Sequence, residues 1–413
     1  MTLLVLLAFI AVVCAGYWLK YLNLSNLKVH GHTVPPEFEG NLDPATLAKI
    51  SDYTIENSRF GLIESIIDNM VLIAFLFSGL LGAYDEWITS LTGSFLGKGV
   101  LFFLFLMFAQ AMIGIPFSLY RTFRIENKYG FNTMTVKLWI TDLLKGLAIG
   151  GVISTLVVLG ALWLVTWSPG LWWFWVWLFF LAVGIFMMYL SPTVIEPLFF
   201  KFEPLTVEGL EERIRSLMEK AGLMVSRVFQ VDASRRSRHS NAYFTGIGKV
   251  KRIVLFDTLL QQMSQDEILA VLAHEVGHWK KKHVLKRIIM TETMAFCGTL
   301  AAFWLLRGNG LPNLLGMVSA SFYAKAVILG FLFSIATFPL TPLFSWLSRR
   351  DERESDRFAA DLMGNAGAMA TALVKLSKEN LANLHPHPLY AAFYYSHPPV
   401  VERIRELRGA GKQ

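Results

Sequence analysis

The chain has 413 residues, of which 54% are hydrophobic and 14% aromatic, and its mean hydropathy is +0.47. These values exceed those of soluble globular proteins, so the sequence predicts a membrane protein. The formal charge of +7 does not indicate nucleic-acid binding, because membrane proteins keep Lys and Arg in their cytoplasmic loops and no basic stripe with interleaved aromatic residues occurs. We therefore expect no nucleic-acid partner.

Seven apolar stretches have about the length, roughly 20 residues, that a helix needs to cross a bilayer. The first is not a typical signal peptide, because it has no basic region before it and Val13 spoils a lipoprotein cleavage site before Cys14, so we expect a retained span. The only cysteines, Cys14 and Cys297, lie in apolar stretches and offer neither a disulfide framework nor a thiolate metal site. The stretches are residues 2–19, 62–84, 97–117, 146–166, 171–191, 288–306 and 314–347.

The short loops between these stretches predict the orientation in the membrane. Residues 20–61 and 118–145 together carry nine Lys and Arg, whereas the loops on the opposite side carry only Lys98 and Arg307. Positive loops face the cytoplasm, so we expect the N-terminus outside and the C-terminus inside. Residues 1–191 then hold spans one to five and residues 288–347 hold spans six and seven. Residues 192–287 and 348–413 lie together on the cytoplasmic side and can form one domain.

Four ionisable residues fall inside the expected spans, and charged groups are too costly to face lipid. They either line protein or water inside the molecule, or take part in helix-to-helix pairing in a dry bundle. These residues are Glu64, Asp68, Glu292 and Lys325.

The first cytoplasmic segment mixes helices with strands. Its pattern predicts an amphipathic helix at 205–223, a strand at 226–232, a basic loop at 233–240 and a hairpin built from 241–248 and 251–260. Ser264, with Glu267 three residues later, has the spacing of a capping box and predicts the start of the next helix. That helix contains the sequence HEVGH.

The HEVGH sequence has the spacing of a zinc hydrolase site. His274 and His278 share one face of the helix and can bind one metal ion, while Glu275 can reach a water molecule beside it. Glu352 and Asp356, four residues apart after the seventh span, lie on the same side of the membrane. One of these two can bind zinc, and the other can hold a ligand histidine by a hydrogen bond. Glu292 is too far along the chain to help.

Several motifs, in this order and with spans in these places, resemble the type I CAAX prenyl protease family of integral-membrane zinc endopeptidases. The motifs are HSNAYF, VLAHEVGHW, ERESD and YYSHPPVVERI, with YRTFRIENKYGFN and VIEPLFFKFEPL in the first half of the chain. The resemblance implies an α-helical polytopic membrane protein of about seven spans around a water-filled chamber, with a cytoplasmic α+β zinc-peptidase domain.

The resemblance also implies a role for individual residues. It makes His274, His278 and Glu352 the ligands of one zinc ion per chain, Glu275 the general base and Asp356 the group behind a ligand histidine. It places Asn241 against the substrate, and His397 and Arg403 toward the reaction centre. This chain departs from the family in having Arg-Glu-Ser between Glu352 and Asp356, which leaves Glu354 as a competing ligand. We expect His30, His32, His239, His283, His385 and His387 to be surface or loop residues.

Peptidases of this type hold the substrate as an added strand, and the segment that begins with Asn241, Ala242 and Tyr243 fits that purpose. The expected function is removal of the C-terminal tripeptide from isoprenylated CAAX proteins, with prenylated or membrane-associated peptides and membrane lipid as partners. One alternative is a membrane quality-control peptidase of broader specificity, and a more distant one is a non-enzymatic transporter. The C-terminal GAGKQ lacks an endoplasmic-reticulum retention signal, which favours a bacterial inner membrane.

Overall fold

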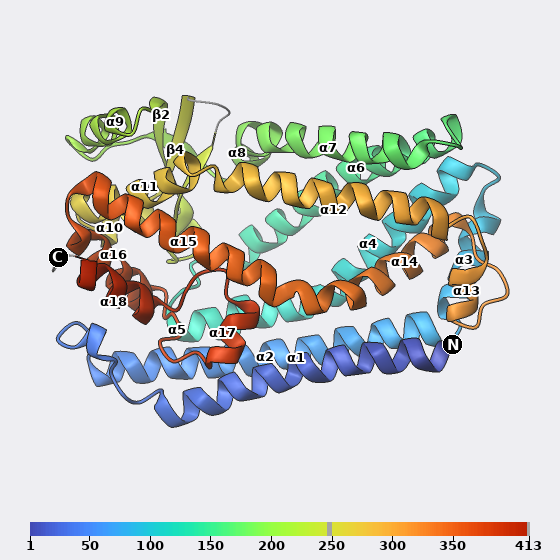
Figure 1. Cartoon of the computed structure of the whole chain (residues 1–413), viewed down its shortest axis with the longest axis horizontal. Coiled ribbons are helices and arrows are strands. Elements are labelled where there is room, and N and C mark those ends of the chain that lie inside the picture. Colours follow the sequence, from blue (N-terminus) through green and yellow to red (C-terminus); the bar gives the residue numbers. More distant parts are fainter. Residues whose placement is uncertain (246–249, 411–413) are drawn as a thin grey trace.

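Seven long apolar helices form one elongated body, and each is long and apolar enough to cross a membrane. The structure, a computed structural model, describes residues 1–245 and 250–410. The helices run side by side, and the polar elements gather at one end of the molecule, opposite the N-terminus (Figure 1). These helices are α1 (Thr2–His30), α2 (Pro44–Phe77), α4 (Phe95–Tyr120), α6 (Val136–Trp167), α7 (Trp172–Leu190), α12 (His283–Leu305), and the pair α14 (Phe322–Thr337) and α15 (Thr341–Met363).

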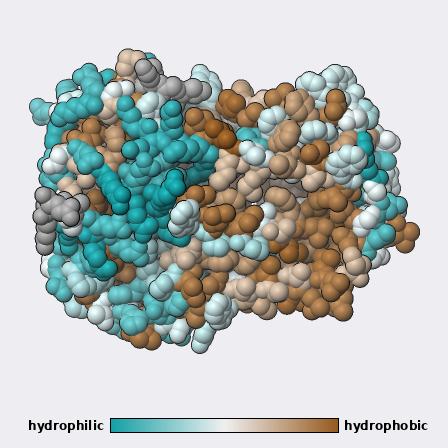
Figure 2. Space-filling view, in the orientation of Figure 1, coloured by the Kyte–Doolittle hydropathy of each residue, from teal (hydrophilic) through white to brown (hydrophobic). Residues whose placement is uncertain are grey.

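The surface follows the same division. In Figure 2 the end that holds the C-terminal elements is hydrophilic, and most of the remaining surface is hydrophobic. Large apolar side chains such as Leu156, Trp163 and Phe186 are exposed in α6 and α7. Apolar side chains are exposed in this number only where lipid replaces water around them. The chain is therefore a multi-pass membrane protein with a polar domain at one end.

Two predicted spans extend past the end or the start of the helix that the structure shows. The second was expected at 62–84, but α2 ends at Phe77, and Gly79, with φ of 90°, begins a separate helix, α3 (Leu80–Leu91). The last was expected from residue 314, but α14 starts at Phe322, where the side chain of Ser321 caps the helix. Helical structure then continues to Met363. Hydropathy alone sees neither the left-handed glycine nor the cap, which explains both errors.

The ionisable residues of the spans differ in their surroundings. Glu64 is ion-paired with Arg121, and Lys325 donates to Asn309 Oδ1, whereas Asp68 is exposed on α2. The first contact is of the kind expected inside a helical bundle. The water-filled chamber stays a prediction.

A small mixed sheet lies in the polar domain. Its strands are β1 (Phe202–Pro204), β2 (Met224–Val231), β3 (Ala242–Thr245) and β4 (Val250–Phe256), in the order β1-β2-β4-β3. β2 and β4 are parallel and the other pairs are antiparallel. The predicted hairpin is correct for β3 and β4 but too long, because Asp257 starts a helix, α10 (Asp257–Gln262). Its turn at 246–249 lies outside the described residues.

Helix α11 (Gln265–Lys280) carries HEVGH, and Ser264 and Glu267 form the predicted capping box at its start. It packs against α9 (Leu210–Lys220), α15 and α16 (Ala366–Glu379). Its apolar face joins a buried core with residues of α9 and β4, among them Ile214, Ile253 and Leu272. The remaining helices are α5 (Asn127–Tyr129), α8 (Glu196–Phe199), α13 (Gly310–Leu314), α17 (Pro388–Tyr394) and α18 (Val400–Ala410).

His239 lies in a loop, as expected, and also joins the polar domain to the spans. Its ring stacks on Phe131 at 4.0 Å between centroids. Its Nε2 lies 3.2 Å from Glu126 Oε2, and its Nδ1 lies 3.1 Å from Asn380 Oδ1. Burial alone would lower the pKa of His239, but the hydrogen bonds to Glu126 and Asn380 raise it above its usual value.

Candidate active site

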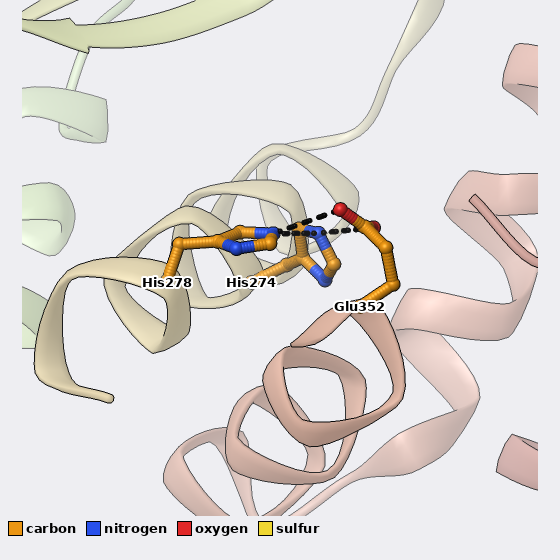
Figure 3. Close-up of side chains that lie close together, drawn as sticks. All are labelled: His274, His278 and Glu352. Carbon is orange, nitrogen blue, oxygen red and sulfur yellow. Dashed lines mark hydrogen bonds and ion pairs between the residues drawn. The ribbon is translucent and has the colours of Figure 1, made fainter. Parts of the chain in front are cut away.

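The two histidines of HEVGH and Glu352 meet between helices α11 and α15 (Figure 3). His274 Nε2 and His278 Nε2 lie 3.1 Å apart. Glu352 Oε2 is 3.2 Å from the first of these nitrogens, and Glu352 Oε1 is 3.1 Å from the second. The helical spacing sets the two rings side by side, and the packing of α15 on α11 brings the carboxylate to them.

These atoms fit a divalent metal ion. Glu352 Oε2 is buried and accepts no hydrogen bond from any described residue. A buried acceptor without a partner costs about 1–3 kcal/mol, and two imidazole nitrogens that face each other at 3.1 Å can share only one proton. A cation placed among the three side chains removes both problems. Two imidazole nitrogens and one carboxylate oxygen are a donor set that zinc prefers at catalytic sites.

The far side of His274 is held by a carboxylate and an arginine. His274 Nδ1 lies 2.8 Å from Asp356 Oδ1. Arg403, on α18, donates twice to Asp356, from Nε at 2.8 Å and from a terminal nitrogen at 2.7 Å. Burial alone would lower the pKa of His274, but the neighbouring carboxylates of Asp356 and Glu352 raise the pKa to about 9. This contact is the carboxylate–histidine arrangement that fixes the orientation of metal-binding imidazoles.

Glu275 and His397 border the same cluster. Glu275 follows His274 on α11, is only partly exposed, and has its pKa raised mainly by removal from water. His397 reaches in from the segment before α18, with its Nε2 3.3 Å from Glu352 Oε1 and its Nδ1 2.9 Å from Ser396 Oγ. The structure therefore brings both His397 and Arg403 to the metal-ligand candidates. Arg403 binds Asp356 most closely, and its terminal nitrogen also lies 3.5 Å from His274 Nδ1 and 3.7 Å from Glu352 Oε2.

Of the expected substrate-binding residues, Ala242 and Tyr243 lie on β3, at one edge of the sheet and against α11, and Asn241 directly precedes this strand. Asn241 Oδ1 accepts a hydrogen bond from the backbone N of Ala242, and the Asn241 carbonyl accepts one from Phe256 N. The side chain of Ala242 is buried. The Tyr243 hydroxyl donates to Glu196 on α8 and so contacts the membrane body instead of the histidine cluster.

The sequence analysis missed His283. It was expected in a basic surface turn, but it is 1% exposed and begins α12 beside the ligand candidates. Its Nδ1 lies 3.2 Å from His278 Nδ1, and its Nε2 lies 3.1 Å from Glu354 Oε2. Glu354 thus faces His283 and not the cluster of His274, His278 and Glu352. The available signal was that His283 follows His278 by only five residues. Contact between the two rings also requires a tight reversal of the chain, which the sequence does not reveal.

Comparisons with known proteins cover nearly the whole chain. Residues 23–201 match the family described as CAAX prenyl protease N-terminal, five membrane helices, and residues 204–410 match peptidase family M48. A CAAX prenyl protease 1 homolog of Arabidopsis thaliana is 34% identical over 398 residues, which cover 92% of each chain. CAAX prenyl protease 1 of Saccharomyces cerevisiae is 32% identical over 418 residues, covering 94% of this chain and 90% of the relative.

The fold is also that of a solved structure. The crystal structure of S. mikatae Ste24p superposes with a TM-score of 0.91 at 30% identity and covers 98% of both chains. The likeness extends over the spans and the polar domain together.

Proposed function

Because this chain belongs to the CAAX prenyl protease family of integral-membrane M48 metallopeptidases, we propose that it removes the C-terminal tripeptide from isoprenylated CAAX proteins. The enzyme class follows from the family, and the transporter alternative falls with it. The observation that carries the proposal is the buried cluster of His274, His278 and Glu352 at the polar end of a membrane body. A hydrolytic site at this position lies next to the membrane spans, where a lipid-linked peptide can reach it.

We assign one zinc ion per chain to His274, His278 and Glu352. When bound, the metal polarises the scissile carbonyl and makes a water molecule easier to deprotonate. Glu275 takes the proton from the attacking water and returns it to the leaving amine. Removal of Glu275 from water raises its pKa and so makes it a stronger base than an exposed carboxylate.

His397 and Arg403 support the reaction in different ways. His397 Nε2 lies beside Glu352 and is placed to donate to the negative charge that develops on the carbonyl oxygen of the substrate. Two donors of Arg403 are already committed to Asp356. Its role is therefore to hold Asp356 against His274 Nδ1, which keeps the ligand ring in orientation.

The substrate backbone is assigned to the open edge of β3. An extended peptide can pair with the main chain from Asn241 to Tyr243, and such pairing recognises backbone instead of particular side chains. β3 packs against α11, so a strand added at this edge runs past the HEVGH helix.

The test compares one CAAX-type peptide in farnesylated, palmitoyl-like and unmodified forms, with kcat/KM measured in detergent. An isoprenyl chain contributes roughly 0.8 kcal/mol for each buried CH₂ group, enough to concentrate the peptide at the membrane body. We expect cleavage after the modified cysteine, fastest for the farnesylated form and abolished by a zinc chelator. Equal values for all three peptides would replace this proposal with the quality-control alternative.

We place the polar domain in the cytoplasm, because nine Lys and Arg fall in the short loops on its side and two on the other. The N-terminus lies at the opposite end of the molecule (Figure 1). Cys14 and Cys297 lie inside spans, so the test of this orientation uses the exposed loop residue Arg307 on the opposite side. A cysteine introduced by Arg307→Cys should react with a membrane-impermeant thiol reagent added to the outside of sealed membranes, with protection as the contrary result. A bacterial inner membrane stays a prediction, which the eukaryotic origin of the relatives above does not support.

A further inference from the structure

His278 has a second partner that the proposed mechanism does not use. Its Nε2 faces His274 and Glu352, and its Nδ1 lies 3.2 Å from Nδ1 of the buried His283. Lys282, in the left-handed conformation with φ of 57°, reverses the chain after α11, so that His283 packs back against His278. A non-glycine residue in this conformation is uncommon and has to be held by its surroundings.

The protons of these groups follow from the chemistry of imidazole. If His278 binds the metal through Nε2 as a neutral ring, its Nδ1 carries the proton and donates. His283 Nδ1 must then accept, and Ser355 Oγ, 3.4 Å away, can donate to the same atom. A neutral His283 therefore carries its proton on Nε2, where Glu354 Oε2 accepts at 3.1 Å and Asp351 Oδ1 lies 3.7 Å away.

We propose that His283 and the carboxylates behind it form a relay that orients the ligand ring of His278. His274 is held by Asp356 and Arg403, and His278 is held correspondingly by His283 and Glu354. Both carboxylates of the relay lie on α15, the helix that also supplies Glu352. The relay thus links α11 to α15 through His278, whereas Asp356 links the same two helices through His274. His283 is a positioning residue, because it touches the ligand and not the reacting atoms.

The same side chains could instead hold a second cation, since His283, Asp351 and Glu354 also lie within reach of one ion. The positions of the imidazole protons argue against a second cation. A neutral His283 that binds a cation through Nε2 carries its proton on Nδ1, which would then face the protonated Nδ1 of His278 at 3.2 Å. Lys281 Nζ, 3.4 Å from Glu354 Oε1, already supplies a positive charge at this carboxylate. In the relay each N–H of His278 and His283 faces an acceptor, whereas a second ion would set two N–H groups against each other.

The test measures zinc affinity of the purified full-length protein by chelator competition, together with the visible spectrum of the cobalt-substituted form. His283→Ala should weaken zinc binding by about 10–100-fold and alter the cobalt spectrum. His283→Gln, whose amide can both accept from His278 and donate to Glu354, should recover most of the affinity. Glu354→Leu should cause a smaller loss, because Asp351 lies beside the same nitrogen. The exposed His32 supplies the control His32→Ala, which should match the wild type.

The inference rests on the proposed assignment of His278 as a ligand, so His278→Ala is measured in parallel. If that variant keeps its zinc, the metal site itself is misassigned. If it loses zinc while His283→Ala binds with wild-type affinity and an unchanged cobalt spectrum, only the relay is wrong. Two zinc ions per wild-type chain, falling to one in Glu354→Leu, would also overturn it. Should His283→Ala fail to fold, the double variant Asp351→Leu with Glu354→Leu decides, and unchanged affinity there refutes the relay.

Discussion

Gly277 sets the distance between the two helices of the metal site, and Gly277→Ala should disturb that site without unfolding the protein. A Cβ atom at this position would lie 2.9 Å from Ser355 Cα and 3.1 Å from both Ser355 Cβ and the Ser355 carbonyl oxygen. Carbon atoms in favourable contact are about 3.5–4.0 Å apart, so α15 must retreat by roughly 0.5–1 Å. Because the obstacle is backbone, a change of rotamer cannot relieve it.

Two opposing terms decide the stability of this variant. Alanine within a helix is favoured over glycine by about 1 kcal/mol. Overpacking of a close contact costs typically 1–3 kcal/mol, so the net loss in the free energy of unfolding should be about 0–2 kcal/mol. The site suffers more, because Glu352 lies on the displaced helix one turn before Ser355. A shift of about 1 Å can lower turnover by about 10²-fold.

The assay is kcat on the farnesylated peptide, with zinc affinity and Tm measured on the same preparations. Gly298→Ala in α12 is the matched control, because its Cβ would meet no atom within 4 Å. The control should keep wild-type values. Wild-type turnover together with a raised Tm in Gly277→Ala would refute the reasoning, since it would show that helix propensity outweighs the contact.

Three further predictions concern single side chains. Glu275→Gln should bind zinc and keep its Tm but lose about 10²–10⁴-fold in kcat, since it removes the base and no ligand; near-normal turnover would contradict the assigned role. Glu352→Ala should lose zinc, as judged by metal analysis, and a zinc-replete protein would reassign the third ligand. His239→Gln should lower Tm most at low pH. The raised pKa of His239 means that its pairing with Glu126 is fully present below about 6.5, the ordinary pKa of histidine, and is lost as the pH rises through the folded-state value. A difference in Tm between the wild type and His239→Gln that grows as the pH rises would contradict this prediction.

Helical spacing was sufficient for part of the active site. His274 and His278 share a face because they are four residues apart, and Ser264 caps their helix as its spacing with Glu267 predicts. Hydropathy also predicted seven spans correctly. In lipid a chain segment must satisfy its backbone hydrogen bonds within itself, so a long apolar segment forms a helix whatever its neighbours are. These are local properties, and the chain within one or two turns contains all the information they need.

What the sequence determined by itself was therefore the membrane class, the HEVGH helix and the same-side placement of its carboxylate partners. Only the tertiary structure decided that Glu354 faces His283 while Glu352 faces both histidines of HEVGH, and that Arg403 binds Asp356. Residues 352, 354 and 356 point in different directions around one helix, and the direction that meets α11 depends on how α15 rotates and how closely it packs. That rotation is fixed by contacts such as Gly277 against Ser355, between residues far apart in sequence, which no local pattern records.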